Sequence, residues 1–294
     1  MNAKTVRGYI FAILSAVIFG CMPLMARYIY ADGVSPSTLV FLRNFLALPS
    51  LAVLAYLQRK SLKVPAKALA PIAAISFFGC CLTPILLFTA YNYIASGTAT
   101  VFHFIYPAVV VLSGILFLKK KAKAEALISV GLCIIGVALF YDPAQPINLA
   151  GSALALGSGI TFALYVLLLA GFRHREISGF LFSFYVAAAS AVIAFIICIV
   201  TGQLALPQTL VGWGLSTLFA LGITCGAVVL FQLGTFIVGG QQSSILSALE
   251  PITSVVVGIV VFKEVLTLRT ALGVVLVIAA TVLIAVTNLT KAKK

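Results

Sequence analysis

Two apolar stretches of the sequence carry polar residues at matching positions, and these residues offer the most scope for chemistry. The later stretch, residues 241–264, places the acid Glu250 directly before Pro251. The earlier stretch, residues 97–120, has Pro107 at the equivalent position, 144 residues before Pro251. A polar group that faces lipid costs several kcal/mol, so polar side chains within apolar spans face protein or a water-filled cavity. We therefore expect a central polar site between the two stretches.

The two prolines predict bends in their helices. A proline inside a helix removes one backbone hydrogen bond and leaves the carbonyl four residues earlier without its usual donor. For Pro107 that carbonyl belongs to His103, and for Pro251 it belongs to Ser247. We expect both prolines to act as hinges, each placing a free acceptor beside a polar side chain. The alternative is an ordinary kink that a neighbouring helix repairs.

The polar residues around these prolines fall on single helical faces. Ser243, Ser247 and Glu250 recur at steps of four and three, which places them on one side of a helix. Thr100 and His103 trace the equivalent face of the earlier stretch. Aromatic residues on other spans are expected to join these faces around a cavity. The residues predicted to bind a ligand there are Phe19, Tyr91, Thr100, His103, Tyr106, Tyr165, Gln242, Ser244, Ser247 and Glu250.

Three of the charged or titratable residues within apolar spans have alternative interpretations. Glu250 lies near the middle of its span, where an ionised acid costs about 2.5 kcal/mol or more, so it is protonated, paired or a proton carrier. Arg43 could bind a ligand carboxylate, or it could extend to the membrane surface or bond to helix ends. His103 could relay protons or simply pack with a hydrogen bond.

Composition indicates which class of protein holds these residues. Hydrophobic residues make up 63% of the 294-residue chain, and charged residues make up 9%. A soluble protein of this length cannot bury so much apolar surface, so we expect an all-α polytopic membrane protein with ten transmembrane helices. The expected spans are Gly8–Tyr30, Ser37–Leu57, Ala68–Asn92, Thr98–Leu118, Ala124–Tyr141, Leu149–Phe172, Gly179–Thr201, Leu210–Ile237, Gln242–Phe262 and Thr267–Asn288.

The basic residues indicate how these spans are oriented. With the N-terminus inside, 15 of the 19 Lys and Arg residues fall on the inner side of the membrane. Because cytoplasmic loops are enriched in Lys and Arg, this distribution predicts that both termini are cytoplasmic. The formal net charge of +13 is therefore an orientation signal, and no nucleic-acid partner is expected.

Internal matches indicate that the chain contains two copies of a five-span unit. At an offset of 143 residues, Gly8 meets Gly151 and Phe19 meets Phe162. Because five is odd, the second copy must enter the membrane from the opposite side, which predicts two inverted repeats as in secondary transporters. The expected parts are a first repeat over residues 1–141, an outer linker over 142–148 and a second repeat over 149–294.

Other chemistries find little support in the sequence. The six cysteines lie within the expected spans without any CxxC, so we interpret them as small buried hydrophobic residues. No phosphate-binding loop, zinc-ligand spacing or HExxH occurs, so no enzyme activity, cofactor or metal is expected. Gly222 and Gly226 are spaced for close helix packing. A lipid-modifying enzyme and a channel or helix scaffold stay open as alternatives to a carrier.

Three motifs carry a resemblance to a known family. They are Tyr93–Ala99 leading to Tyr106-Pro107, Phe236–Gly240 leading to Leu249-Glu250-Pro251, and Lys263-Glu264 followed by Leu266-Thr267 and Gly273. With them, nearly the whole chain resembles two EamA units of the drug/metabolite transporter superfamily in its ten-helix form. The first half departs from the pattern, because Tyr106 and Lys119-Lys120 stand where the family has acids. Glu250 and Glu264 are the copies that remain.

The resemblance implies a function and a location. It implies export of small metabolites across the bacterial plasma (inner) membrane by alternating access, and the chain looks most like exporters of aromatic and other neutral amino acids. Such a cavity would hold the side chain on aromatic faces, the ammonium on freed carbonyls and the carboxylate at helix N-termini. The expected partners are a small-molecule substrate and the lipid bilayer, and the chain is compatible with a monomer.

Overall fold

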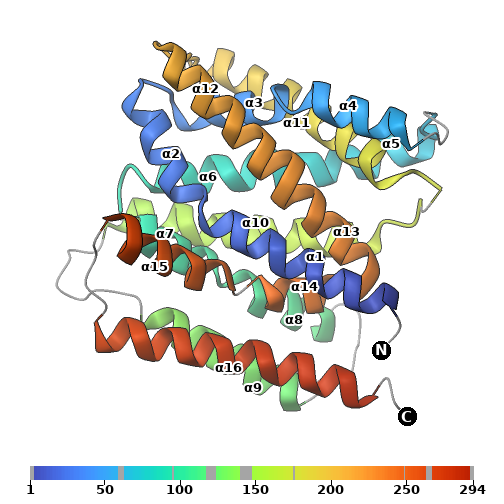
Figure 1. Cartoon of the computed structure of the whole chain (residues 1–294), viewed down its shortest axis with the longest axis vertical. Coiled ribbons are helices and arrows are strands. Elements are labelled where there is room, and N and C mark those ends of the chain that lie inside the picture. The colour runs from blue at the N-terminus through green and yellow to red at the C-terminus, as the bar shows by residue number, and fades with distance from the viewer. Residues whose placement is uncertain are drawn as a thin grey trace.

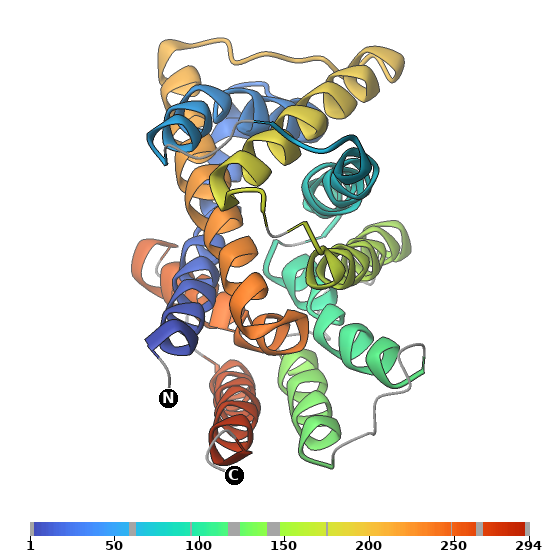
Figure 2. The same cartoon turned by 90° about the vertical axis from the view of Figure 1, so that its right-hand side faces the viewer.

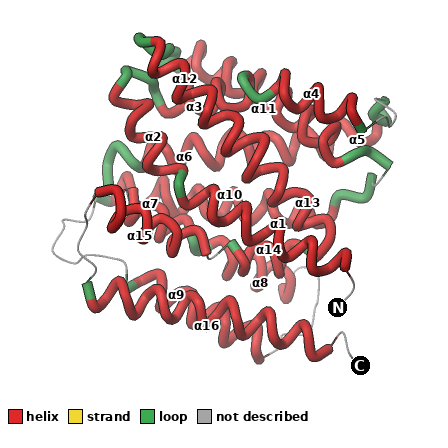
Figure 3. Tube along the Cα trace, viewed as in Figure 1, coloured by secondary structure: helices red, strands yellow, loops and turns green. Residues whose placement is uncertain are grey.

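The architecture of this computed structural model is all-helical over the residues that it describes (Figures 1 and 3). No strand occurs in that part of the chain. The described residues are 3–58, 63–94, 96–116, 124–139, 148–174, 176–247, 249–262 and 267–291. Lys119-Lys120, Lys263-Glu264 and most of the expected linker therefore lie outside the described residues.

The helices follow the order of the apolar runs in the sequence. In the first half they are α1 (Ala3–Gly20), α2 (Met22–Ala31), α3 (Pro36–Phe45), α4 (Leu48–Leu57), α5 (Ala66–Ile75), the π-helical η1 (Ser76–Leu82), α6 (Thr83–Ala90), α7 (Ser96–His103), α8 (Tyr106–Leu116) and α9 (Ala124–Ala138). In the second half they are α10 (Leu149–Gly171), α11 (Gly179–Val200), α12 (Leu210–Phe219), the π-helical η2 (Ala220–Val228), α13 (Val229–Val238), α14 (Gly240–Leu246), α15 (Leu249–Phe262) and α16 (Leu268–Lys291).

Small polar residues begin several of these helices. Ser35, Asn148, Ser178 and Thr209 each accept a hydrogen bond from a backbone N–H in the first turn of α3, α10, α11 and α12. These bonds satisfy N–H groups that have no partner within the helix. Capping thus sets where the helices start, and it does so from local sequence alone.

Six stretches of the described chain are long and apolar enough to cross a membrane, which identifies a multi-pass membrane protein. They are Ala3–Ala31, Pro36–Leu57, Ala66–Ala90, Leu149–Gly171, Gly179–Val200 and Leu210–Val238. The other four expected spans coincide with α7–α8, α9, α14–α15 and α16, which are shorter, interrupted or bordered by residues outside the description. As membrane crossings, these four stay predictions.

Irregular backbone recurs at matching places in the two halves. The π-helical segments η1 and η2 begin at Ser76 and Ala220, 144 residues apart. Helix α7 is separated from α8 by a turn at residues 104–105, and α14 ends at Leu246, before α15 begins at Leu249. These features fit a two-repeat architecture, and the breaks fall just before the two prolines that predicted them.

The helices that frame the interior come from both halves of the chain. Helix α1 packs against α13 and α15, while α10 packs against α6, α7 and α8. Helix α11 covers α3 and α4 on another side. Helices α9 and α16 lie side by side at one edge of the molecule, and both described ends of the chain lie at the same end of it (Figures 1 and 2).

Hydrogen bonds join the two halves where α2 meets α12. The Oδ2 atom of Asp32 accepts from the backbone N–H of Gln208 at 2.9 Å and of Thr209 at 3.1 Å. Thr38 donates from Oγ1 to the carbonyl of Gln203 at 2.9 Å. We call these residues the interhalf latch. It holds the connection between α2 and α3 against the connection between α11 and α12.

The latch predicts an acid-sensitive step in stability. Although desolvation raises the pKa of Asp32, hydrogen bonds from Thr209 and Gln208 hold this pKa below its ordinary value of 3.8. An acid with a lowered folded-state pKa stabilises the fold above its unfolded pKa, and the contribution is lost as the pH falls through the folded value. Asp32→Ala should melt at a lower temperature than the wild type in detergent at neutral pH, and this gap should narrow on acidification. Glu176→Ala is the control, because Glu176 bonds only His174 within the same loop; an equal effect there would contradict the role of the latch.

Candidate functional site

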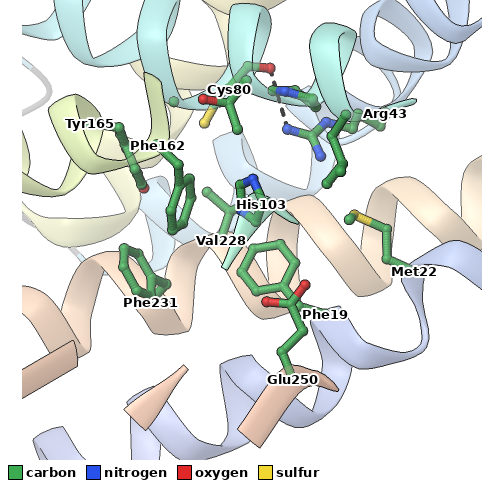
Figure 4. Close-up of a pocket in the computed structure, with 14 residues that line it drawn as sticks. Phe19, Met22, Arg43, Cys80, His103, Phe162, Tyr165, Val228, Phe231 and Glu250 are labelled. Carbon is green, nitrogen blue, oxygen red and sulfur yellow. Dashed lines mark hydrogen bonds between the residues drawn. The ribbon is translucent and has the colours of Figure 1, made fainter. Parts of the chain in front are cut away.

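A small cavity lies between the two halves, at the level of the π-helical segments (Figure 4). Its volume is about 40 Å³, which is room for a few water molecules. Its lining consists of Phe19, Met22, Arg43, Gly79, Cys80, Thr83, Pro84, Leu87, His103, Phe162, Tyr165, Val228, Phe231 and Glu250. The walls are therefore mainly apolar, with one basic side chain, one acidic side chain and one imidazole among them. A metabolite could enter only after the helices move apart.

The structure brings four of the predicted binding residues to this cavity, namely Phe19, His103, Tyr165 and Glu250. Tyr106 lies directly behind the lining, where its ring packs on Phe162 with centroids 4.7 Å apart. These five come from α1, α7, α8, α10 and α15. Their convergence supports the expected central site, although ligand binding by each of them stays a prediction.

The other predicted residues lie outside the lining. Tyr91 and Thr100 are joined by a hydrogen bond of 3.4 Å between their hydroxyl oxygens. On α14, Ser244 donates to the carbonyl of Gln241, and Ser247, in the turn that follows, donates to the carbonyl of Ser243. Gln242 is half-buried on the same helix. The structure does not place these five side chains around the cavity, and a role for them in an opened cavity stays a prediction.

The two hinge prolines differ in what happens to the carbonyl four residues earlier. The carbonyl of Ser247 accepts from the backbone N–H of Glu250 at 2.9 Å, so the expectation of a free acceptor there was wrong. A tighter turn before Pro251 supplies the missing donor. Before Pro107, α10 comes so close that a Cβ atom at Gly159 would lie 2.5 Å from the carbonyl oxygen of His103. Only glycine allows this approach.

An aromatic cluster forms one wall of the cavity. The ring of Phe162 packs against His103 at 5.3 Å between centroids, and against Tyr165 and Phe231 at 5.3 and 5.5 Å. Such arrangements are favourable beyond the area that they bury. The sequence reasoning had not assigned Phe162 or Phe231 to the site. The repeat match between Phe19 and Phe162 was the signal that could have found Phe162.

His103 is held by a second shell on α10. Its Nδ1 lies 2.8 Å from the hydroxyl of Ser158, which itself donates to the carbonyl of Ala155 at 2.6 Å. Because the hydroxyl hydrogen of Ser158 is used in this way, Nδ1 of His103 is the donor to it. In the neutral ring, Nε2 is then an acceptor. The hydrogen-bonded packing expected as one alternative for His103 is therefore present.

Arg43 lies inside the protein and not at the membrane surface. Only 3% of the residue is exposed, and its Nη2 donates to the carbonyl of Cys80 at 3.3 Å (Figure 4). Asn44 donates to the same carbonyl from Nδ2 at 3.2 Å. Pro84, four residues after Cys80, cannot donate a backbone hydrogen bond to this carbonyl. The acceptor that holds Arg43 is thus created by a proline in the neighbouring span.

Glu250 lies on the opposite side of the cavity. It is 6% exposed and belongs to the first turn of α15, where the helix dipole favours negative charge. Its carboxyl group forms no ion pair with a described cation, and Figure 4 shows Phe19 and His103 between it and Arg43. No group of three His, Cys, Asp or Glu residues that could hold a metal occurs among the described residues. The cavity therefore presents two separated charged groups on an aromatic background.

Comparisons with known proteins give the chain its relatives. The sequence profile described as the EamA-like transporter family matches residues 6–141 and again residues 149–286. An uncharacterized transporter of Haemophilus influenzae is 26% identical over 164 residues, which is 54% of this chain and 53% of that protein. Uncharacterized transporters of Clostridium kluyveri and Archaeoglobus fulgidus are 21% and 26% identical, and the matches cover 94% and 91% of this chain and 92% of each relative.

A protein of known crystal structure has the same fold. It superposes with a TM-score of 0.74 over 94% of this chain and 96% of its own, at 14% sequence identity. At that identity the likeness concerns the fold alone.

Proposed function

Because the chain belongs to the EamA-like transporter family, we propose that it is a secondary transporter that exports small metabolites, among them aromatic and other neutral amino acids. The observation that carries this proposal is the cavity, whose lining comes from both matched segments. Phe19, Arg43 and His103 belong to the first, and Phe162 and Glu250 to the second. A site shared between repeats near the bilayer midplane is typical of secondary transporters.

The size of the cavity supports alternating access. At about 40 Å³ it is far smaller than an amino acid, so the state described here is a contracted one. The interhalf latch closes one end of the molecule in this state. Transport then requires the two halves to move against one another, with bending at Pro107 and Pro251.

Reconstituted liposomes test this function. Protein-containing liposomes should take up labelled phenylalanine, tryptophan or threonine faster than empty ones. Preloading them with unlabelled amino acid should accelerate the uptake, because a carrier returns with cargo, whereas an open channel shows no such counterflow. Uptake equal to that of empty liposomes for all three amino acids would overturn the proposed substrates.

The proposal includes a specific arrangement in the membrane. Residues 1–141 and 149–294 form two inverted repeats joined by the linker 142–148, with ten spans and both termini in the cytoplasm of a bacterial inner membrane. The distribution of Lys and Arg supports this orientation. The latch supports it as well, since the segments that it joins are both expected on the outer side.

Accessibility labelling tests the arrangement. In a variant without native cysteines, a cysteine at Lys63 should react with a membrane-impermeant reagent only from the cytoplasmic side. A cysteine at Gln208 should react only from the outside. Labelling of both positions from one side would exclude the inverted repeats.

A further inference from the structure

Arg43 has hydrogen-bonding capacity that the protein does not use. A guanidinium group carries five N–H donors. The structure gives it a bond from Nη2 to the carbonyl of Cys80, and its buried Nε has no partner among the described residues. A buried charge is costly unless it is paired and hydrogen-bonded. The carbonyl of Cys80 and the ring of Phe88, 5.9 Å from Cζ, offset only part of that cost.

No protein anion completes the pairing in the described part of the chain. The one ion pair found there, between His174 and Glu176, lies in a surface loop. Glu250 lines the same cavity as Arg43 yet stays beyond ion-pairing distance, with Phe19 and His103 between them (Figure 4). The two opposite charges therefore remain separated across one small space.

The position of the guanidinium is fixed before any ligand arrives. Asn44 and Arg43 share the carbonyl of Cys80 as acceptor, and this carbonyl lacks a backbone donor because of Pro84. Asn44 is held further by a bond of 2.8 Å to the carbonyl of Val40. Arg43 thus lines the cavity as a positioned donor, which reduces the entropy that a ligand must offset on binding.

We propose that Arg43 binds the carboxylate of the transported molecule, while Glu250 faces its ammonium group across the cavity. A planar guanidinium suits a carboxylate because it can donate two parallel hydrogen bonds to it. The aromatic wall of Phe162, Tyr165 and Phe231 takes the apolar side chain. The cavity therefore selects zwitterions against amines that have the same side chain but lack the carboxylate. This inference rests on the proposed transport function and assigns its specificity to one residue.

Paired ligands test the assignment directly. Binding of L-phenylalanine, phenethylamine and 3-phenylpropionate to purified protein in detergent is measured by calorimetry, and competition with labelled phenylalanine uptake is measured in liposomes. The wild type should bind phenylalanine about tenfold or more tightly than either analogue, since a hydrogen bond to a charged group is worth about 1.5–3 kcal/mol. Arg43→Gln should reduce phenylalanine binding to the level of phenethylamine and leave phenethylamine binding unchanged.

Two further variants keep the test decisive. Arg43→Lys preserves the charge but not the paired donors, so it should weaken phenylalanine binding less than Arg43→Gln, and it replaces that variant if Arg43→Gln does not fold. Arg27→Gln removes an exposed arginine of α2 and should change neither ligand. If an Arg43 variant weakens phenylalanine and phenethylamine alike, Arg43 is a structural residue and the assignment is overturned.

The outcomes also separate this inference from the proposed function. A wild type that transports phenylalanine and phenethylamine equally well is a transporter without the carboxylate subsite. A wild type that binds and transports none of the three ligands overturns the proposed amino-acid substrates and this inference with them.

Discussion

Replacing Glu250 with glutamine will lower substrate transport at least about tenfold while the protein stays folded. The side chain is nearly fully buried, lines the cavity and pairs with no described cation. Such an acid is costly within a membrane span, so packing alone does not explain it. Glutamine has almost the same shape but cannot carry the charge or a transferable proton. A hydrogen bond to a charged group is worth about 1.5–3 kcal/mol, which corresponds to about tenfold or more in affinity.

The measurement is uptake of labelled phenylalanine into liposomes with and without an imposed pH gradient. Glu125→Gln is the matched control, because Glu125 begins α9, away from the cavity. If Glu250 carries protons, the gradient should accelerate the wild type and have no effect on Glu250→Gln. Equal wild-type rates in both conditions would identify a uniporter. An unchanged rate in Glu250→Gln would remove Glu250 from the site.

Replacing Gly159 with alanine will destabilise the protein, although alanine normally favours a helix. The added Cβ would lie 2.5 Å from the carbonyl oxygen of His103 and 2.8 Å from a side-chain carbon of Ile105, so α10 and α7 must move apart. Overpacking of this kind costs about 1–3 kcal/mol. The movement would also disturb the bond between Ser158 and His103, so we expect transport to fall together with the melting temperature.

Gly157 provides the control on the same helix. A Cβ atom there would meet only Leu86, at an ordinary contact distance of 3.7 Å. Gly157→Ala should therefore melt at or above the temperature of the wild type, because alanine is the better helix former by about 1 kcal/mol. Melting curves of the two variants in the same detergent decide the matter. Equal melting temperatures would show that α10 and α7 do not depend on this close approach.

Glycine spacing in the sequence did not identify this contact. The spacing of Gly222 and Gly226 predicted close helix packing, but a Cβ at Gly222 would meet no atom within 4 Å, and one at Gly226 would make only ordinary contacts. The prediction was wrong for Gly222 because a spacing pattern places residues on one helical face without saying what that face meets. At Gly159 the deciding atom is a backbone carbonyl of another helix.

The sequence by itself determined the helices and where they are interrupted. Apolar runs, capping residues and prolines act over a few residues, so α10, α11 and the breaks before Pro107 and Pro251 could be predicted from local spacing. The match at an offset of 143 to 144 residues likewise predicted where irregular backbone would recur, as the starts of η1 and η2 now show.

Only the tertiary structure decided which polar side chains share one cavity. From the sequence, Arg43 could face the membrane surface or a ligand, since both fit the same place on its helix. Its orientation depends on the carbonyl of Cys80, on another helix, and on Pro84, which leaves that carbonyl without a backbone donor. Ser244 and Ser247 were equally good candidates by spacing, yet both bond back to their own segment. Helical periodicity says which residues share a face, and only the packing of helices distant in the sequence says what that face surrounds.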